Sequence, residues 1–445
     1  MLRCQDLENN AQFYRLRLKD LWFIMHNAQF IIDSSETQNI ASLLVGFDLP
    51  LSKSVRAREL VLDALSGFDV KIEEDNDDLF VLSRALCNAQ CIMHNAQLSD
   101  KSDWSDESDN SQFSTLNLNA SGTALRFMTA FCAVSEGEYV LTGSKRLCER
   151  PIKPLVDTLC RMGAKIEYID KEGFAPLRIK GGKLKGGKVS LDASLSSQFV
   201  SALMLIADKV EGGVDIEYEG DVASEAYIRL TEKVIERYRS GERRSEEKDW
   251  SSATVWYAAM AVLRKGRFLL EGLSLDSCQP DRAIVDVFEK LGVRTIETER
   301  GVIIEANGDI VDNLVVDCKN MPDAVMYIAV AACVLGVDFE ISGIETLRVK
   351  ESDRIEALIT EMRKCGYLIQ CTMHNAQCIM HNAQCIMHNA QCTDLVKIET
   401  YDDHRMAMAM AVVGLVMDVE IENPEVVNKS YPRFWEEIRK IKNRK

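Results

Sequence analysis

The sequence lacks any apolar stretch long enough to cross a membrane. Its longest apolar runs are Tyr327–Val337 and Met406–Met417, and both fall short of the ~18 residues that a spanning helix needs. The N-terminus also lacks the basic, apolar and small-residue segments of a cleaved secretion signal. We therefore expect a cytoplasmic protein without a membrane partner, whose 14 cysteines are reduced thiols.

Basic residues are few relative to acidic ones. Lys plus Arg number 53 against 69 Asp plus Glu, for a net charge of −16. Non-specific nucleic-acid binding needs a basic surface, so we exclude nucleic acid as a partner. A local group of Lys and Arg can still outweigh the net charge inside a cleft, which leaves small anionic ligands open. The 445 residues, 47% hydrophobic and 27% charged, are typical of two or three folded domains.

Histidine is scarce outside one repeated hexapeptide. IMHNAQ fills Ile24–Gln29 and Ile92–Gln97, and related copies with a cysteine at every seventh position fill residues 371–392. His404 is the only histidine outside these repeats. A Cys followed three residues later by a His could hold a metal on one helix face. Identical copies at separate places instead favour a functionless insertion, so we leave the tract out of the fold prediction and expect no metal.

A succession of helix, glycine and strand recurs three times. The three copies are Pro151–Met162 with Gly163, Lys165–Ile169 and Pro176–Ile179; Asp281–Leu291 with Gly292 and Val293–Ile296; and Glu351–Cys365 with Gly366 and Tyr367–Gln370. Such repetition without close identity predicts structural repeats of α/β units. Ser54–Leu65 predicts another helix, and the acidic Leu98–Asn110 predicts a surface loop. Arg237–Lys248 is either a hinge between two halves or the polar end of a helix with its loop.

Four short motifs place polar or basic groups at the start of an expected helix. They are Leu49–Arg58, Asn119–Arg126, Cys148–Pro151 and Ser196–Gln198. Free amides at a helix N-terminus bind anions together with Lys, Arg or hydroxyl groups. The first motif lacks the glycines of a phosphate-binding loop. Taken singly, the first motif is more typical of a solvated lysine and the second of an ordinary capped helix, whereas Ser196–Gln198 is equally typical of a helix cap and an anion site.

A fifth cluster combines Arg348–Arg354 (RVKESDR) with Tyr401–Met406 (YDDHRM). Lys350 and Arg354 are expected on one helix face, where their charges repel unless an anion lies between them. Glu351 beside them is expected to stay ionised at neutral pH. A surface helix with a like-charge pair is the alternative.

In this order, the clusters resemble the enolpyruvyl transferase family, and most closely the members that use shikimate 3-phosphate. The matching patterns are SKSxxxR, GTAxR, ERPIxxLVDxLxxxGA, SSQFxSAL, Ser224–Tyr227 with YIxxT, DWSSA, PDAxM, RVKESDR, DHRMAM and KSYP. They span the chain from Leu49 onward, apart from the repeat tract and Leu98–Asn110. The resemblance implies a mixed α/β (α+β) fold of two domains, each built from three βαβαββ units, with the active site in the cleft. The expected domains are 51–247, and 1–50 plus 248–445, with crossings near Pro50 and Lys248.

The resemblance also implies an activity and the residues that perform it. The enolpyruvyl group of phosphoenolpyruvate would pass to the 5-hydroxyl of shikimate 3-phosphate, a step toward aromatic amino acids that glyphosate targets in the family. The residues expected to contact shikimate 3-phosphate are Lys53, Ser54, Arg58, Ser196, Ser197, Gln198, Ser224, Tyr227, Asp323 and Lys350. Those expected around phosphoenolpyruvate are Gly122, Arg150, Gln198, Arg354, Arg405 and Lys429. Proton transfer would fall to Lys53, Asp323, Glu351 and His404. No cofactor is implied, and we expect a monomer.

Some residues depart from the family pattern. Thr346 stands where a substrate-contacting Asn is common, so we give it no role, and Ala226 stands where Pro is common. Two other functions stay open. One is enolpyruvyl transfer to UDP-N-acetylglucosamine, which uses a loop cysteine that has no clear counterpart here. The other is a non-catalytic α/β scaffold whose repeats bind metal, against which the retained basic residues count.

Overall fold

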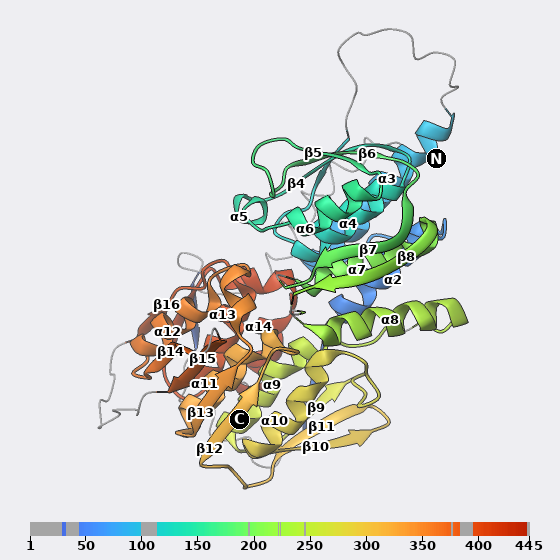
Figure 1. Cartoon of the computed structure of the whole chain (residues 1–445). Coiled ribbons are helices and arrows are strands. Elements are labelled where there is room, and N and C mark those ends of the chain that lie inside the picture. The colour runs from blue at the N-terminus through green and yellow to red at the C-terminus, as the bar shows by residue number, and fades with distance from the viewer. Residues whose placement is uncertain are drawn as a thin grey trace.

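The computed structural model of the chain describes residues 29–32, 44–98, 114–194, 196–220, 222, 224–243, 246–374, 377–382 and 395–442. Helices and strands alternate along it and build five sheets in this described part (Figure 1). The α-helices are α2 (Lys53–Leu65), α3 (Asp77–Leu98), α4 (Gly122–Val134), α5 (Lys145–Cys148), α6 (Lys153–Arg161), α7 (Ser197–Ile206), α8 (Glu225–Ser240), α9 (Trp250–Leu263), α10 (Ile284–Lys290), α11 (Val325–Leu335), α12 (Arg354–Lys364), α13 (His404–Val413) and α14 (Phe434–Lys442). None of the helices described is long and apolar enough to cross a membrane.

Most strands are short and lie between helices. They are β1 (Gln29–Ile32), β2 (Leu44–Asp48), β3 (Ser114–Asn117), β4 (Gly137–Thr142), β5 (Lys165–Tyr168), β6 (Leu177–Gly181), β7 (Lys185–Asp192), β8 (Glu211–Glu219), β9 (Arg267–Glu271), β10 (Val293–Thr298), β11 (Gly301–Ala306), β12 (Asn313–Asp317), β13 (Asp338–Ser342), β14 (Ile369–His374), β15 (Gln377–Asn382), β16 (Val396–Ile398) and β17 (Val419–Glu422). Short 3₁₀ turns are η4 (Ala207–Lys209), η5 (Pro280–Ala283), η6 (Pro322–Ala324), η7 (Glu345–Val349) and η8 (Pro424–Lys429).

The first half of the molecule, residues 51–247, encloses a hydrophobic core of its own. Its sheets have the strand orders β3-β4-β6-β5 and β7-β8. Helix α4 reads GTALRFMTAFCAV and is apolar nearly all round, which predicts burial on every side. It contacts α2, α3 and α7 and the strand β6, so its apolar faces all pack against a neighbour.

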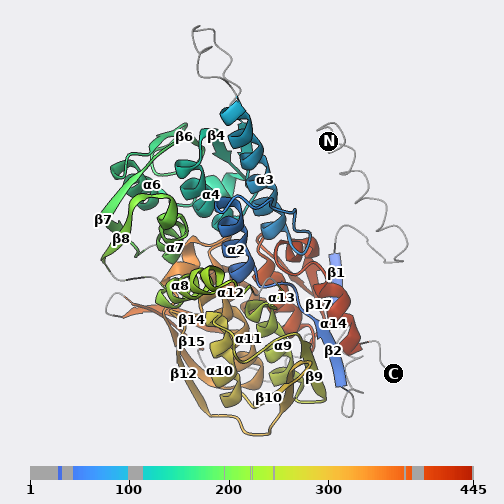
Figure 2. The ribbon, with the colours of Figure 1, turned by 90° about the vertical axis from the view of Figure 1, so that its right-hand side faces the viewer.

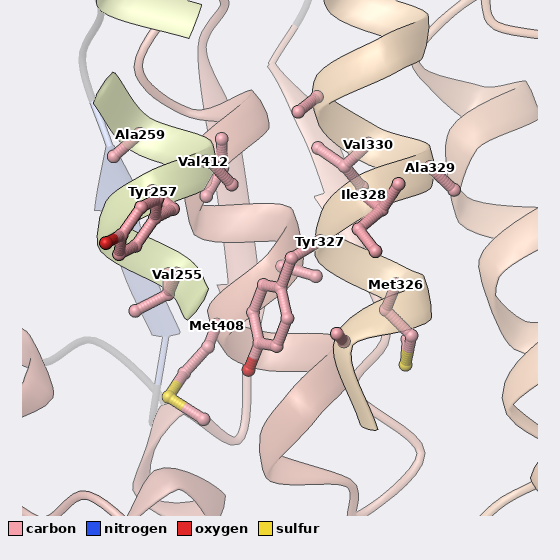
Figure 3. Close-up of a cluster of buried hydrophobic side chains, with 14 of the residues drawn as sticks. Val255, Tyr257, Ala259, Met326, Tyr327, Ile328, Ala329, Val330, Met408 and Val412 are labelled. Carbon is pink, nitrogen blue, oxygen red and sulfur yellow. The ribbon is translucent and has the colours of Figure 1, made fainter. Parts of the chain in front are cut away.

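The second half has a separate core around α9, α11 and α13 (Figure 3). Tyr257 from α9, Tyr327 and Ile328 from α11, and Met408 from α13 gather in it, and each is buried. The longest apolar runs of the sequence therefore form central helices. The surrounding sheets have the orders β10-β11-β9-β2, β12-β13-β15-β14 and β1-β17-β16.

The two crossings between the halves lie side by side. The Ser52 amide donates to the Glu247 carbonyl (2.7 Å), the Asp249 amide donates to the Pro50 carbonyl (3.0 Å), and Leu51 pairs with Lys248. Before the first crossing, β2 pairs with β9 and β1 pairs with β17, so the N-terminal strands join the second half (Figure 2). The separate cores and the adjacent crossings support the expected domain boundaries, which stay a proposal.

Most predicted elements are present with shifted ends. Helices α2 and α7 match the predictions, and α6 ends before Gly163 in a left-handed conformation (φ 102°), as a helix stop requires. The helix predicted from Glu351 begins only at Arg354, after the cap Asp353. Helix α8 ends at Ser240 before Gly241, which confirms the helix-end interpretation there. The segment predicted as a loop beyond Leu98, 99–110, lies outside the described residues.

The repeated hexapeptide adopts two different structures. Residues Ile92–Gln97 continue helix α3, whereas the copy that begins at Ile379 enters strand β15. Leaving out the whole tract was therefore wrong for its first part, because β14 and β15 complete the sheet of β12 and β13. Residues 24–28 and 383–392 lie outside the described residues.

Candidate active site

A cavity lies where the two halves meet. It is lined by every predicted site residue except Lys429. The lining residues from the first half lie on or beside α2, α3, α4, α6, α7 and α8, and those from the second half on or beside α9, η6, η7, α12 and α13. The additional lining residues are Asp78, Thr123, Arg126, Phe127, Pro151, Phe199, Asp249, Ser251, Pro322, Thr346 and Val349.

Helix N-termini converge on this cavity because capping residues begin the helices there. The caps that accept a backbone N–H with their side chains are Ser52 of α2, Ser121 of α4, Ser196 of α7, Asp249 of α9 and Asp403 of α13. The residues after each cap line the cavity. A helix N-terminus carries a partial positive charge and free amides, so their convergence favours an anionic ligand.

The side chains strengthen the same preference. Seven Lys and Arg line the cavity against four Asp and Glu, although the chain as a whole carries −16. Six buried polar atoms of lining residues have no hydrogen-bond partner in the structure: Nε of Arg126, Arg150 and Arg405, Oγ of Ser224, and both ring nitrogens of His404. Buried polar groups are rarely left unsatisfied, so an anion with several oxygens would suit this lining.

Glu351 is the centre of one group of charges. Its Oε1 accepts from Lys429 Nζ at 2.7 Å and lies 3.7 Å from Arg150 Nη1, and its Oε2 accepts from Arg354 Nη2 at 2.9 Å. Burial alone would raise the pKa of this carboxyl, but Lys429, Arg354 and Arg150 together hold it well below its usual range. Lys429 does not line the cavity, yet it reaches the site through Glu351 and also donates to the Ala120 carbonyl across the halves.

Asp323 is the centre of a second group. Its carboxylate lies 3.4 Å from Lys350 Nζ, 2.8 Å from Arg354 Nη1 and 3.2 Å from Arg405 Nη2. Burial opposes ionisation, but these cations and Lys53 keep the pKa of Asp323 well below its usual range. The expectation that Lys350 and Arg354 share a helix face was wrong, because Lys350 is extended backbone before α12. The anion between them is Asp323.

Residues 43–438 match the family EPSP synthase (3-phosphoshikimate 1-carboxyvinyltransferase). The chain belongs to this family. A relative named 3-phosphoshikimate 1-carboxyvinyltransferase from Bacteroides fragilis is 34% identical over 413 residues, covering 88% of this chain and 94% of the relative. One of the same name from Syntrophobacter fumaroxidans is 35% identical over 434 residues, covering 91% and 98%.

Solved structures show the same fold. EPSP synthase from Acinetobacter baumannii superposes with a TM-score of 0.65 at 20% identity, covering 93% of this chain and 98% of that one. The enolpyruvyl transferase NikO from Streptomyces tendae gives a TM-score of 0.60 at 13% identity, with the same coverage of 93% and 98%. The expected two-domain, mixed α/β fold of the EPSP synthase family is therefore confirmed.

Lys53 and His404 have contrasting surroundings in this EPSP synthase family site. Lys53 Nζ donates to Asp78 Oδ2 at 3.0 Å. Burial would lower the pKa of the Lys53 ammonium, but Asp78 outweighs it with help from other carboxylates, so the pKa is raised. His404 is 1% exposed and neither ring nitrogen has a hydrogen-bond partner in the structure. Burial, and then the charges of Arg405, Lys429 and Lys53, hold its pKa well below the usual range, so the ring is neutral at pH 7.

Sequence reasoning missed several lining residues. Asp78 follows Asp77 at a helix start, where acidic residues are ordinary, and nothing in the sequence joined it to Lys53. Thr123 accepts from Gln198 Nε2 at 3.0 Å, which only the packing of α4 against α7 brings about. Arg126 stood in the GTAxR pattern and could have been assigned from it. Thr346, which was given no role, also lines the cavity.

No cluster of three or more His, Cys, Asp or Glu suited to a metal ion occurs among the residues that the structure describes. The end of the repeat tract, 383–392, lies outside them. The cavity's donor set is rich in ammonium, guanidinium and hydroxyl groups, which bind oxyanions directly.

Proposed function

We infer that this chain transfers the enolpyruvyl group of phosphoenolpyruvate to the 5-hydroxyl of shikimate 3-phosphate. The observation that carries the inference is the excess of Lys and Arg in a cavity formed by helix N-termini, within a chain of net charge −16. Both substrates are multiply anionic and repel each other. Fixed cations on both sides of the cavity offset that repulsion and hold the reacting atoms together.

We assign the first half mainly to shikimate 3-phosphate. The assigned residues are Lys53, Ser54, Arg58, Ser196, Ser197, Gln198, Ser224 and Tyr227, with Asp323 and Lys350 on the hydroxyls of the shikimate ring. Arg58 supports this assignment because it holds the subsite together. It donates to the Ser54 carbonyl at 2.6 Å and to Thr231 Oγ1 at 2.8 Å, which ties α2 to α8.

We assign Gly122, Arg150, Gln198, Arg354, Arg405 and Lys429 to phosphoenolpyruvate. Gly122 supports this arrangement by its lack of a side chain, since a Cβ there would lie 2.3 Å from Arg150 Nη1. Arg354 is oriented by Asp403, whose two oxygens accept from Nε at 2.7 Å and Nη2 at 3.2 Å. Such a paired contact fixes the plane of the guanidinium.

The proposed reaction is an addition followed by an elimination. The 5-hydroxyl loses its proton and its oxygen bonds to C2 of phosphoenolpyruvate, while the C2–C3 double bond becomes a single bond and C3 takes a proton. The C2–O bond to phosphate then breaks, and C3 loses a proton to restore a double bond. Lys429 and Glu351, 2.7 Å apart, form an acid and base pair for the proton at C3. Asp323 is kept ionised by Lys350, Arg405 and Arg354, and we assign it the role of accepting the proton of the 5-hydroxyl. Lys53 and His404 complete the set of groups proposed for proton transfer.

The domain boundaries 51–247, and 1–50 plus 248–445, belong to the same proposal, as does a monomer acting in the cytoplasm. Cys371 is disulfide-bonded, which contradicts the expectation that every cysteine is a reduced thiol, whereas Cys132 and Cys318 are buried free thiols.

The test is phosphate release from phosphoenolpyruvate with shikimate 3-phosphate, with UDP-N-acetylglucosamine as the control acceptor and a chelator present. We expect phosphate release from phosphoenolpyruvate when shikimate 3-phosphate is the acceptor, and none when UDP-N-acetylglucosamine is the acceptor. Release with UDP-N-acetylglucosamine alone, or none from protein shown to be folded, would overturn the proposal.

Arg150→Ala tests the phosphoenolpyruvate assignment. We expect kcat/KM to fall by roughly a hundredfold or more, because a desolvated charge contact to the anion is lost. Circular dichroism should be unchanged. The matched control is Arg294→Ala on the exposed face of β10, which should keep full activity. Full activity in Arg150→Ala would refute the assignment.

A further inference from the structure

Asp281 lies behind the cavity and contacts two residues that line it. It sits on the 3₁₀ turn η5 of the second half and is 2% exposed. Its Oδ2 accepts from Tyr227 Oη at 3.0 Å and, by a short hydrogen bond, from Ser251 Oγ. Tyr227 and Ser251 belong to the cavity lining, and Asp281 does not. No step of the proposed reaction uses this carboxylate.

The two partners of Asp281 lead to different parts of the site. Tyr227 lies on α8 of the first half, and its carbonyl accepts from Arg58 Nη2 at 3.4 Å. Ser251 lies in the first turn of α9, and its carbonyl accepts from Arg405 Nη1 at 3.1 Å. The Asp281 carboxylate therefore holds Tyr227, which is assigned to shikimate 3-phosphate. It also holds Ser251, whose carbonyl supports Arg405, a residue assigned to phosphoenolpyruvate.

The segment that carries Asp281 is anchored at the second chain crossing. Gln279 Nε2 donates to Glu247 Oε1 and to the Lys248 carbonyl, each at 2.8 Å. Gln279 Oε1 accepts from the Trp250 amide at 3.0 Å. Asp281 thus stands on backbone that is fixed to the point where the two halves join, so it can hold Tyr227 in a defined place relative to the second half.

We propose that Asp281 is a positioning residue. Its carboxylate orients the Tyr227 hydroxyl and fixes Ser251, whose carbonyl accepts from Arg405, and it thereby aligns the two substrate subsites across the halves. This inference rests on the proposed function. It assigns to Asp281 an effect on substrate affinity rather than on proton transfer.

The charges around Asp281 make this role dependent on pH. The groups that face it are Tyr227 from α8, Asp249 at the start of α9, Asp323 from η6, Arg405 from α13 and Cys318 after β12. Burial, and then Asp323, raise the pKa of Asp281 to about 6 against the opposing effects of Arg405 and Ser251. The carboxylate is ionised above that pH. Protonation as the pH falls through about 6 weakens both hydrogen bonds, since a charged acceptor binds more strongly than a neutral one.

Four variants test the proposal: Asp281→Ala, Asp281→Asn, Tyr227→Phe and the double variant Asp281→Ala with Tyr227→Phe. At pH 7.5 we expect Asp281→Ala and Tyr227→Phe each to raise KM for shikimate 3-phosphate by roughly tenfold to a hundredfold, with kcat changed much less. The double variant should be no worse than the poorer single variant, because both remove the same contact. Asp286→Ala on the exposed face of α10 is the matched control and should behave as wild type.

The pH profile separates positioning from a merely structural role. Asp281→Asn keeps an oxygen acceptor of the same shape without the charge, so at pH 7.5 its KM for shikimate 3-phosphate should already be raised toward the value that the wild type reaches below pH 6. Its KM should also lack the extra rise below pH 6 that the wild type shows. If Asp281→Ala does not fold, the pH profiles of KM for Asp281→Asn and the wild type still test the proposed role of Asp281. The same acid limb in Asp281→Asn and wild type would overturn the proposal.

The remaining outcomes are also distinct. A wild-type chain that releases no phosphate overturns the proposed function and this inference with it. An active wild type in which the Asp281→Ala and Tyr227→Phe effects on KM multiply overturns this inference alone. So does an Asp281→Ala variant with lower thermal stability and unchanged KM.

Discussion

Single residues in this site share their partners. Asp323 forms ion pairs with three cationic side chains, and Glu351 does the same. Arg354 contacts three carboxylates, those of Glu351, Asp323 and Asp403. Arg354 is 2% exposed, and removing one partner of such a buried group leaves the others uncompensated. Single substitutions here are therefore expected to have large effects that do not add.

Gly122 provides a prediction at this scale. A Cβ on Gly122 would lie 2.3 Å from Arg150 Nη1 and 2.8 Å from Arg126 Nη1. Both atoms end flexible side chains, so Gly122→Ala should fold and displace the two guanidinium groups. We expect KM for phosphoenolpyruvate to rise about tenfold, the equivalent of roughly one charged hydrogen bond. Steady-state kinetics against Gly182→Ala, whose added Cβ would have no neighbour within 4 Å, measure the effect. An unchanged KM would contradict the assignment of Arg150.

At the scale of helices and strands, sequence reasoning succeeded where a cap and a periodic pattern agreed. Ser52 before α2 and Ser196 before α7 mark helix starts that were predicted from the sequence, and both starts line the cavity. It failed where the signal was absent from the local sequence. Lys350 and Arg354 have the spacing of helical neighbours, but the cap Asp353 begins the helix between them. The partnership of Lys53 with Asp78 depends on the packing of α2 against α3.

The repeated hexapeptide marks the limit of local prediction most clearly. The same residues are helical after Cys91 and extended after Cys378. In β15 the methionine Met380 is fully buried between strands β13 and β14, whereas its equivalent Met93 in α3 is half-buried. Tertiary packing thus decides the structure of this sequence, which its own propensities leave open.

The two methionines provide a matched prediction. Met380→Ala should lower the free energy of unfolding by about 2–4 kcal/mol, because it leaves a cavity in the core of the second half. Met93→Ala should cost about 1 kcal/mol or less, because it loses only part of that burial. Denaturant unfolding of the two variants measures both values. Equal costs would contradict the placement of the tract in the sheet.

At the scale of the whole molecule, opposite charges are separated between surface and site. The net charge is −16, yet the cavity between the halves is lined by more Lys and Arg than Asp and Glu. An acidic exterior repels anionic substrates, and the basic cavity attracts them at short range.

This separation predicts a measurable salt dependence. Higher ionic strength weakens the attraction that draws anionic substrates toward a cleft lined by cations, and the added chloride competes with them for the same Lys and Arg. We expect kcat/KM for phosphoenolpyruvate to fall about threefold or more between 50 and 300 mM NaCl, with kcat nearly constant. Initial rates at matched pH measure it. The variant Lys188→Gln on exposed β7 should show the same slope, and a flat or rising kcat/KM would contradict the prediction.

The pairing of β2 with β9 has a consequence for how the protein is made. On the ribosome, β2 emerges before the first half, and its partner β9 follows roughly 220 residues later, about 10–40 s at the usual rate of synthesis. Phe47 of β2, which ends stacked on Trp256 at 3.9 Å between ring centroids, has no partner in that interval. The first half can fold in that interval, because residues 51–247 have all left the ribosome before β9 does. The nascent chain thus carries an exposed apolar strand at its front, where a chaperone that binds extended peptides would find it.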